Sequence, residues 1–152
     1  ALTLLACSLQ ASNVSAAFIN ESMRVDSKYN VYAAQKVDNL ACFILKAESL
    51  NHYTLAILRS LLSLEKHEMQ LTHEDAKSAC TLEMKLKDAK REKLLIKYQK
   101  HVAISTANTQ SSSSLEALCT FNILKRSRNA ENETVFSLQD NDTTREILSR
   151  LA

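Results

Sequence analysis

The sequence contains neither glycine nor proline in 152 residues. At average usage of about 7% and 5%, roughly 18 would be expected in a chain of this length. Glycine supplies left-handed turn positions and proline fixes turn geometry, so a domain rich in tight turns could hardly do without both. Long helices can, because both residues destabilise a helix interior. The absence therefore favours an all-α fold, and it excludes glycine-rich phosphate-binding loops of the Walker or Rossmann type.

The cysteine spacing and the small net charge both argue against particular kinds of ligand. The four cysteines lie at positions 7, 42, 80 and 119, and no two of them form a CxxC pair, which argues against a zinc site. We interpret them as buried thiols of an intracellular protein; the alternative is two disulfides in a secreted bundle. The net charge of +2 gives no strong field, so binding to nucleic acid is not expected.

The segment from Leu40 to Leu71 carries an apolar seam that is typical of a long helix. Apolar side chains recur every three or four residues and therefore fall on one helical face. The seam broadens over residues 55–64, which indicates cover on two or more sides, as in a bundle. We expect six seam residues to carry packing or assembly: Leu40, Phe43, Leu50, Ile57, Leu61 and Leu64.

The chain divides into three regions by pattern. Residues 1–104 are predicted to form the core, a helical bundle or antiparallel coiled-coil hairpin with long helices. A helix from about residue 31 to 70 is followed by another from His73 to about 104, because Thr72 and the acidic residues after it are a helix-start signature. Residues 105–114 (STANTQSSSS) lack apolar periodicity and are predicted to be a Ser-rich linker. Residues 115–152 are predicted to form short C-terminal helices that pack on the core.

A lysine stripe marks the predicted 73–104 helix. Lys90, Lys93, Lys97 and Lys100 follow one another at intervals that place them on one helical face. Such a stripe could bind phosphate groups on an anionic membrane; the alternative is a solvated face. Only Tyr98 interleaves with the lysines, which argues against single-stranded nucleic acid as a ligand.

The sequence holds no catalytic, cofactor or metal motif. The histidines and their acidic neighbours form no Glu-x-x-His pair of the di-metal type, so we expect no enzyme, no cofactor and no metal. The expected function is a protein–protein interaction or assembly subunit that binds other chains, copies of itself included. One alternative is a secreted four-helix cytokine-like ligand, suggested by Asn-x-Ser/Thr sites at 13, 20, 132 and 141. A second alternative is a helical module that binds anionic membrane through the lysine stripe.

Overall fold

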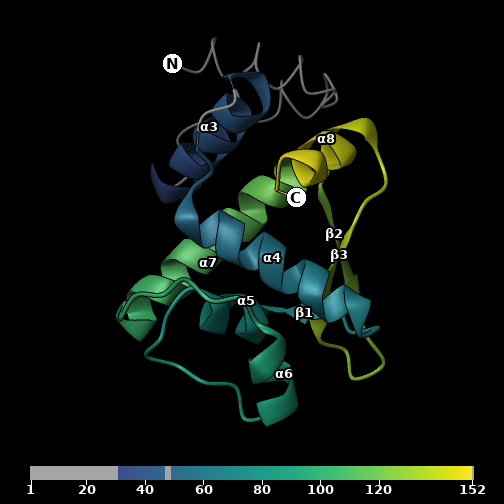
Figure 1. Cartoon of the computed structure of the whole chain (residues 1–152). Helices are drawn as coiled ribbons and strands as arrows, with labels where there is room; N and C mark the ends of the chain where they lie inside the picture. Colours follow the sequence, from purple (N-terminus) through teal and green to yellow (C-terminus); the bar gives the residue numbers. More distant parts are fainter. Residues whose placement is uncertain (1–30, 47–48, 152) are drawn as a thin grey trace.

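The computed structural model describes residues 31–46 and 49–151, and it shows a mixed α/β fold (Figure 1). These residues form helices α3 (Val31–Lys46), α4 (His52–Lys66), α5 (His73–Ala79), α6 (Ala89–Leu94), α7 (Ile104–Thr120) and α8 (Asp142–Leu151), and strands β1 (Leu71–Thr72), β2 (Leu124–Arg128) and β3 (Thr134–Leu138). The prediction of an all-α helical bundle or coiled-coil hairpin is therefore wrong. The three strands form one antiparallel sheet, and the longest helix among the described residues has only 17 residues.

The predicted long helix over residues 31–70 is two helices, α3 and α4. Asn51 begins the second one: its side chain accepts hydrogen bonds from the amides of Tyr53 and Thr54 at 3.0 and 3.2 Å. Asn39 fixes the connection, because its side chain accepts from the Asn51 amide at 2.7 Å and donates to the Ser49 carbonyl at 3.2 Å. The apolar spacing continues across this break, so periodicity alone does not reveal it.

The six seam residues all lie in the buried core of this one chain. Leu40 and Phe43 belong to α3, Leu50 precedes α4, and the remaining three belong to α4. Each fully buried leucine or isoleucine among them stabilises the fold by about 1.5–3 kcal/mol. The structure thus places these residues in packing within the chain, and a role in assembly between chains stays a prediction.

Helix α5 begins where the sequence predicts but ends early. Thr72 and Asp75 form a capping box, in which each side chain accepts from the other residue's amide, at 2.8 and 3.2 Å. The helix stops at Ala79 instead of continuing to about residue 104. The capping chemistry marks a helix start, and it carries no information about the length of the helix that follows.

Residues 80–103, here called the α5–α7 segment, replace most of the predicted second long helix. They contain α6 as their one helix. The buried side chain of Thr81 joins the two ends of the segment. Its hydroxyl accepts from the amides of Glu83 and Val102, both at 3.0 Å, and donates to the Val102 carbonyl at 2.5 Å. These hydrogen bonds give the backbone partners that a continued helix would otherwise supply.

The predicted Ser-rich linker over residues 105–114 is also wrong, because these residues lie in α7. Helix α7 contacts α3, α4 and α5, and in Figure 1 it runs behind α4 towards α8. Ser111, Ser113 and Ser114 are buried in these contacts, and the Thr54 hydroxyl of α4 donates to the Ser114 hydroxyl at 3.1 Å. Serine is a weak helix former, but packing of small side chains between helices outweighs propensity here.

Strands β2 and β3 form a hairpin within residues 115–152, where the sequence predicts only short helices. Leu124 pairs with Leu138, and β3 lies between β2 and β1, where Phe136 pairs with Leu71. The short C-terminal helix predicted from the sequence is present as α8, and Asn141 caps it by accepting from the Thr144 amide at 2.8 Å. The hairpin and α8 complete the described part of the chain.

No helix within residues 31–46 and 49–151 is long and apolar enough to cross a membrane. The expectations that concern Cys7 and the Asn-x-Ser/Thr sites at 13 and 20 lie outside the described residues.

Candidate functional site

A cleft of about 860 Å³ separates the tip of the β2–β3 hairpin from residues 84–91 of the α5–α7 segment. Two of the elements beside it, α6 and the lower end of the hairpin, can be followed in Figure 1. Its apolar lining comes from the turn before β1, the segment and β3: Met69, Met84, Leu86 and Val135. The volume is typical of a ligand-binding pocket.

Charged side chains of both signs line the same cleft. Six are carboxylates, Glu68, Glu74, Asp75, Asp88, Glu131 and Glu133, and three are cations, Lys85, Lys87 and Arg91. Two of these residues form an ion pair with each other. Arg91 donates to both carboxylate oxygens of Asp75, at 2.5 and 3.2 Å, and also to the Gln70 carbonyl at 2.6 Å. The hydrogen bonds to Asp75 raise the pKa of Arg91 by more than burial lowers it. The pair therefore forms a fixed part of the cleft floor.

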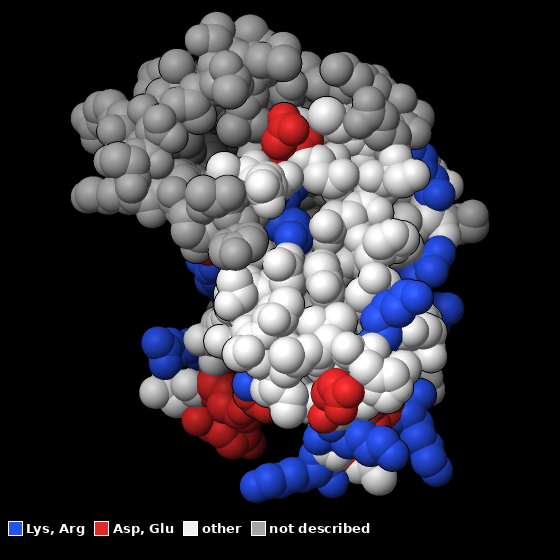
Figure 2. All heavy atoms as spheres, turned by 90° about the vertical axis from the view of Figure 1, so that its left-hand side faces the viewer, with Lys and Arg blue, Asp and Glu red and all other residues white. Residues whose placement is uncertain are grey.

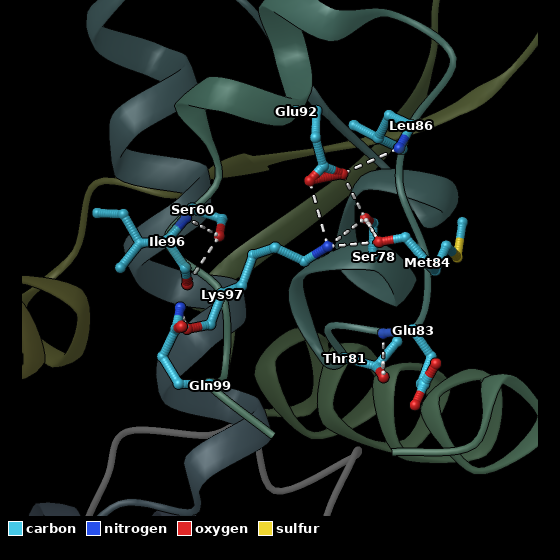
Figure 3. Close-up of polar contacts among 10 residues, drawn as sticks. All are labelled: Ser60, Ser78, Thr81, Glu83, Met84, Leu86, Glu92, Ile96, Lys97 and Gln99. Atoms are coloured by element: carbon cyan, nitrogen blue, oxygen red, sulfur yellow. Dashed lines mark hydrogen bonds and ion pairs between the residues drawn. The ribbon is translucent and has the colours of Figure 1, made fainter. Parts of the chain in front are cut away.

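Behind the cleft lies a polar network centred on Glu92 and Lys97 (Figure 3). The Lys97 ammonium donates to Glu92 at 3.2 Å, to the Ser78 hydroxyl at 3.1 Å and to the Met84 carbonyl at 2.6 Å. Glu92 also accepts from the Ser78 hydroxyl at 2.7 Å and from the Leu86 amide at 2.9 Å. The network thus ties the α5–α7 segment to α5.

The network contains the residue types of some catalytic groups, but its serine is not exposed to solvent. Burial alone would raise the pKa of Glu92, but hydrogen bonds from Leu86, Ser78 and Lys97 outweigh it and lower the pKa below 4.5. A serine beside a lysine can serve as a nucleophile with its base. Ser78, however, is fully buried at 0% exposure, so a substrate has no access to its hydroxyl. The arrangement holds the segment in place.

The structure does not place the four predicted stripe lysines on one helical face. Helix α6 ends at Leu94, and the side chain of Lys97 turns inward to 11% exposure beside Glu92. Lys90, Lys93 and Lys100 remain exposed. Anion binding by these three lysines stays a prediction, but Lys97 is already engaged.

The thiols of Cys80 and Cys119 are in their unreactive, protonated form. Burial raises the pKa of Cys80 to about 12 and also raises the pKa of Cys119, so both remain protonated at neutral pH. In the part of the chain that the structure describes, no group of three or more His, Cys, Asp or Glu side chains could hold a metal ion.

Comparison with known proteins does not assign the chain to a family. No protein-family model matches the chain, and searches of curated proteins and of solved structures find no match. Function is therefore argued from the cleft itself.

Sequence reasoning missed the cleft because its walls come from distant segments. Lys85 and Lys87, like Glu131 and Glu133, are visible as like charges two residues apart. Nothing in the sequence brings residues 84–91 beside the hairpin tip, since that contact depends on where the unpredicted hairpin lies. The residue that reaches across to β1, Arg91, carries no motif either.

Proposed function

We propose that the chain is a non-enzymatic protein-interaction module that binds a segment of another protein in the cleft. The observation that carries this proposal is the cleft lining, which combines four apolar side chains, two of them methionines, with charges of both signs. Methionine side chains are flexible and polarisable and are common on surfaces that adapt to peptide partners. A mixture of apolar and charged groups is usual in interfaces between proteins.

Nucleic acid is the first competing ligand, because α7 followed by a hairpin resembles the arrangement of winged helix-turn-helix domains. In helix-turn-helix proteins the second helix lies in the major groove and contacts bases. Helix α7 contains no lysine or arginine, and α3 packs against it. The six carboxylates of the cleft would also repel phosphates. Connectivity alone does not establish function, and these features favour a protein partner.

The cytokine-like ligand and the membrane-binding module both lose support from the fold. A cytokine-like ligand requires a four-helix bundle, and the described fold is mixed α/β. Membrane binding through the stripe requires four lysines on one face, and Lys97 pairs with Glu92 instead. A protein partner requires neither feature.

Selection from a random peptide library displayed on phage, with the full chain as bait, tests the proposal. Two exposed glutamines provide matched variants, since Gln70 lines the cleft and Gln99 does not. We expect Gln70→Trp to fill the cleft and weaken the selected peptides by about tenfold or more, with Gln99→Trp binding as the wild type does. Circular dichroism checks that both variants fold. A library that yields no binder, or binders that Gln70→Trp leaves unaffected, would contradict a peptide-binding cleft.

A further inference from the structure

The two walls of the cleft carry net charges of opposite sign. Lys85 and Lys87 lie on the wall formed by the α5–α7 segment, together with Asp88 and with Arg91, which is paired with Asp75. Glu131 and Glu133 lie on the facing wall at the hairpin tip. Figure 2 shows basic and acidic groups gathered at the lower end of the molecule, the end that carries α6 in Figure 1. The surface above them in that view is largely uncharged.

These four charges form no ion pair within the described part of the chain, although Glu133 lies near enough to Arg91 to help raise its pKa. Each of the cations Arg91, Lys97, Arg126, Arg145 and Arg150 forms an ion pair with a carboxylate. Among residues 31–46 and 49–151, no ion pair includes a wall lysine or a wall glutamate. The cleft keeps the opposite charges apart, so a field runs across it from one wall to the other.

Both walls are held by buried or local hydrogen bonds. The Leu86 amide, between the two lysines, donates to Glu92 at 2.9 Å. At the hairpin tip the Asn129 side chain accepts from the amides of Glu131 and Glu133 at 3.0 and 2.9 Å. A ligand that uses these charges does not have to order the loops that carry them, which removes part of the cost of binding.

The opposed charges of the two walls favour an extended ligand over a helical one. On a helix, residues of one face recur every three or four positions, whereas the two walls of the cleft present opposite charge to opposite sides of a ligand. In an extended segment, successive side chains point to opposite sides, so alternate residues would face alternate walls.

We propose that the cleft recognises an extended protein segment in which basic and acidic side chains alternate. Basic side chains face Glu131 and Glu133, and acidic side chains face Lys85 and Lys87. This inference rests on the proposed function and adds the charge pattern of the partner to it. The pattern, more than the total charge, decides binding.

Two labelled octapeptides of equal composition test the pattern. One alternates lysine and glutamate, and the other places four lysines before four glutamates, so both have the same net charge. Fluorescence anisotropy measures their affinity for the full chain, and amide NMR shifts of residues 84–88 and 129–135 report where they bind. We expect the alternating peptide to bind about tenfold tighter or better, because the block peptide sets like charges against one wall.

Charge-reversed variants assign the effect to the walls. Lys85→Glu with Lys87→Glu, or Glu131→Lys with Glu133→Lys, should abolish the preference, because both walls then carry the same sign. Reversing all four should restore it, since the field then runs the other way and the peptide shifts by one residue. Lys90→Glu with Lys93→Glu makes the same charge change on exposed residues of α6 that do not line the cleft, and should leave the preference unchanged.

The outcomes separate the pattern from the function. Equal binding of the two octapeptides overturns the alternating pattern, and so does failure of both to shift the cleft amides. A preference that survives reversal of a single wall overturns it as well. In each case the proposed function stands or falls separately, by whether Gln70→Trp weakens peptides from the random library.

Discussion

At the scale of single residues, the charged side chains differ in whether they form a largely buried ion pair or stay exposed to solvent. The side chains of Glu92 and Lys97 are only 15% and 11% exposed and use nearly every donor and acceptor on one another and on neighbours. Removing one member of such a pair leaves the other buried without its counter-charge, which costs more than the pair contributes. The wall lysines Lys85 and Lys87 are exposed and form no such pair among the described residues. The first group therefore stabilises the fold, and the second is the one available for the proposed binding.

Glu92→Gln should lower the free energy of unfolding by about 2–3 kcal/mol at pH 7, because Lys97 loses its carboxylate. The pH dependence has a definite sign. Hydrogen bonds lower the pKa of folded Glu92 from its ordinary value, so its stabilisation is present above that ordinary value and is lost as the pH falls through the folded pKa. Urea unfolding at pH 7 and at progressively lower pH measures both effects, and the gap between wild type and variant should narrow in acid.

Glu83→Gln is the matched control for that experiment. Glu83 is 49% exposed and pairs with the exposed His101 at 3.0 Å, so its loss should change stability by no more than about 0.5 kcal/mol. If Glu92→Gln costs as little as this control, or if its gap to the wild type does not depend on pH, then the Glu92 network does not hold the segment.

At the scale of elements, a chain without glycine has to end its helices with other residues. Helix α4 ends in a Schellman motif, in which Glu68 has φ of 59° and the amides of Glu68 and Met69 donate to the carbonyls of Glu65 and Leu64, both at 3.0 Å. Helix α7 ends in the same way at Asn122, also with φ of 59°. Asparagine tolerates the left-handed region, whereas glutamate has a steric cost of about 1–2 kcal/mol there.

Glu68→Gly should therefore raise the free energy of unfolding by about 1 kcal/mol. Asn122→Gly should raise it less, because asparagine is already tolerated at that position. Arg59→Gly is the control, since Arg59 is exposed inside α4, and there glycine should cost about 1 kcal/mol. Urea unfolding of the three variants measures the order. A Glu68→Gly chain no more stable than the wild type would show that the strain is relieved elsewhere.

The elements also show which parts of the fold could be predicted from sequence. Local chemistry succeeded where side chains bond their own helix, as in the capping box of Thr72 and Asp75. It failed at Asn51, whose cap interrupts an apolar period that continues beyond it. It failed again for α7 and the hairpin, because buried serines and strand pairs are stabilised by distant partners such as α3 and β1. The cleft could not be predicted from the sequence for the same reason, since distant segments form it.

At the scale of the whole molecule, the α5–α7 segment is attached to the body by apolar contacts of Leu86, Leu94 and Leu95 with the core and by several polar contacts. Arg91 bridges to Asp75 and Gln70, and Ser60 of α4 exchanges hydrogen bonds with the backbone of Ile96, accepting at 2.9 Å and donating at 3.3 Å. Helix α6 has no buried residue. An element with so little apolar burial should open at a lower free energy than the core helices. The lysine wall of the cleft would open with it.

Arg91→Ala should selectively loosen this segment. The change removes the contacts to Asp75 and Gln70 but leaves the core under α4 and α7 untouched. In native-state hydrogen exchange we expect the amides of residues 84–94 to exchange faster by about tenfold or more, because the lost charge-assisted hydrogen bonds are worth about 1.5–3 kcal/mol. Amides of α7 should change only by any loss of global stability. Arg145→Ala, which removes an exposed ion pair with Asp142, should leave the exchange of residues 84–94 as in the wild type. Equal acceleration across all helices would instead mean that the segment and the core unfold as one unit, and that the cleft walls are as rigid as the core.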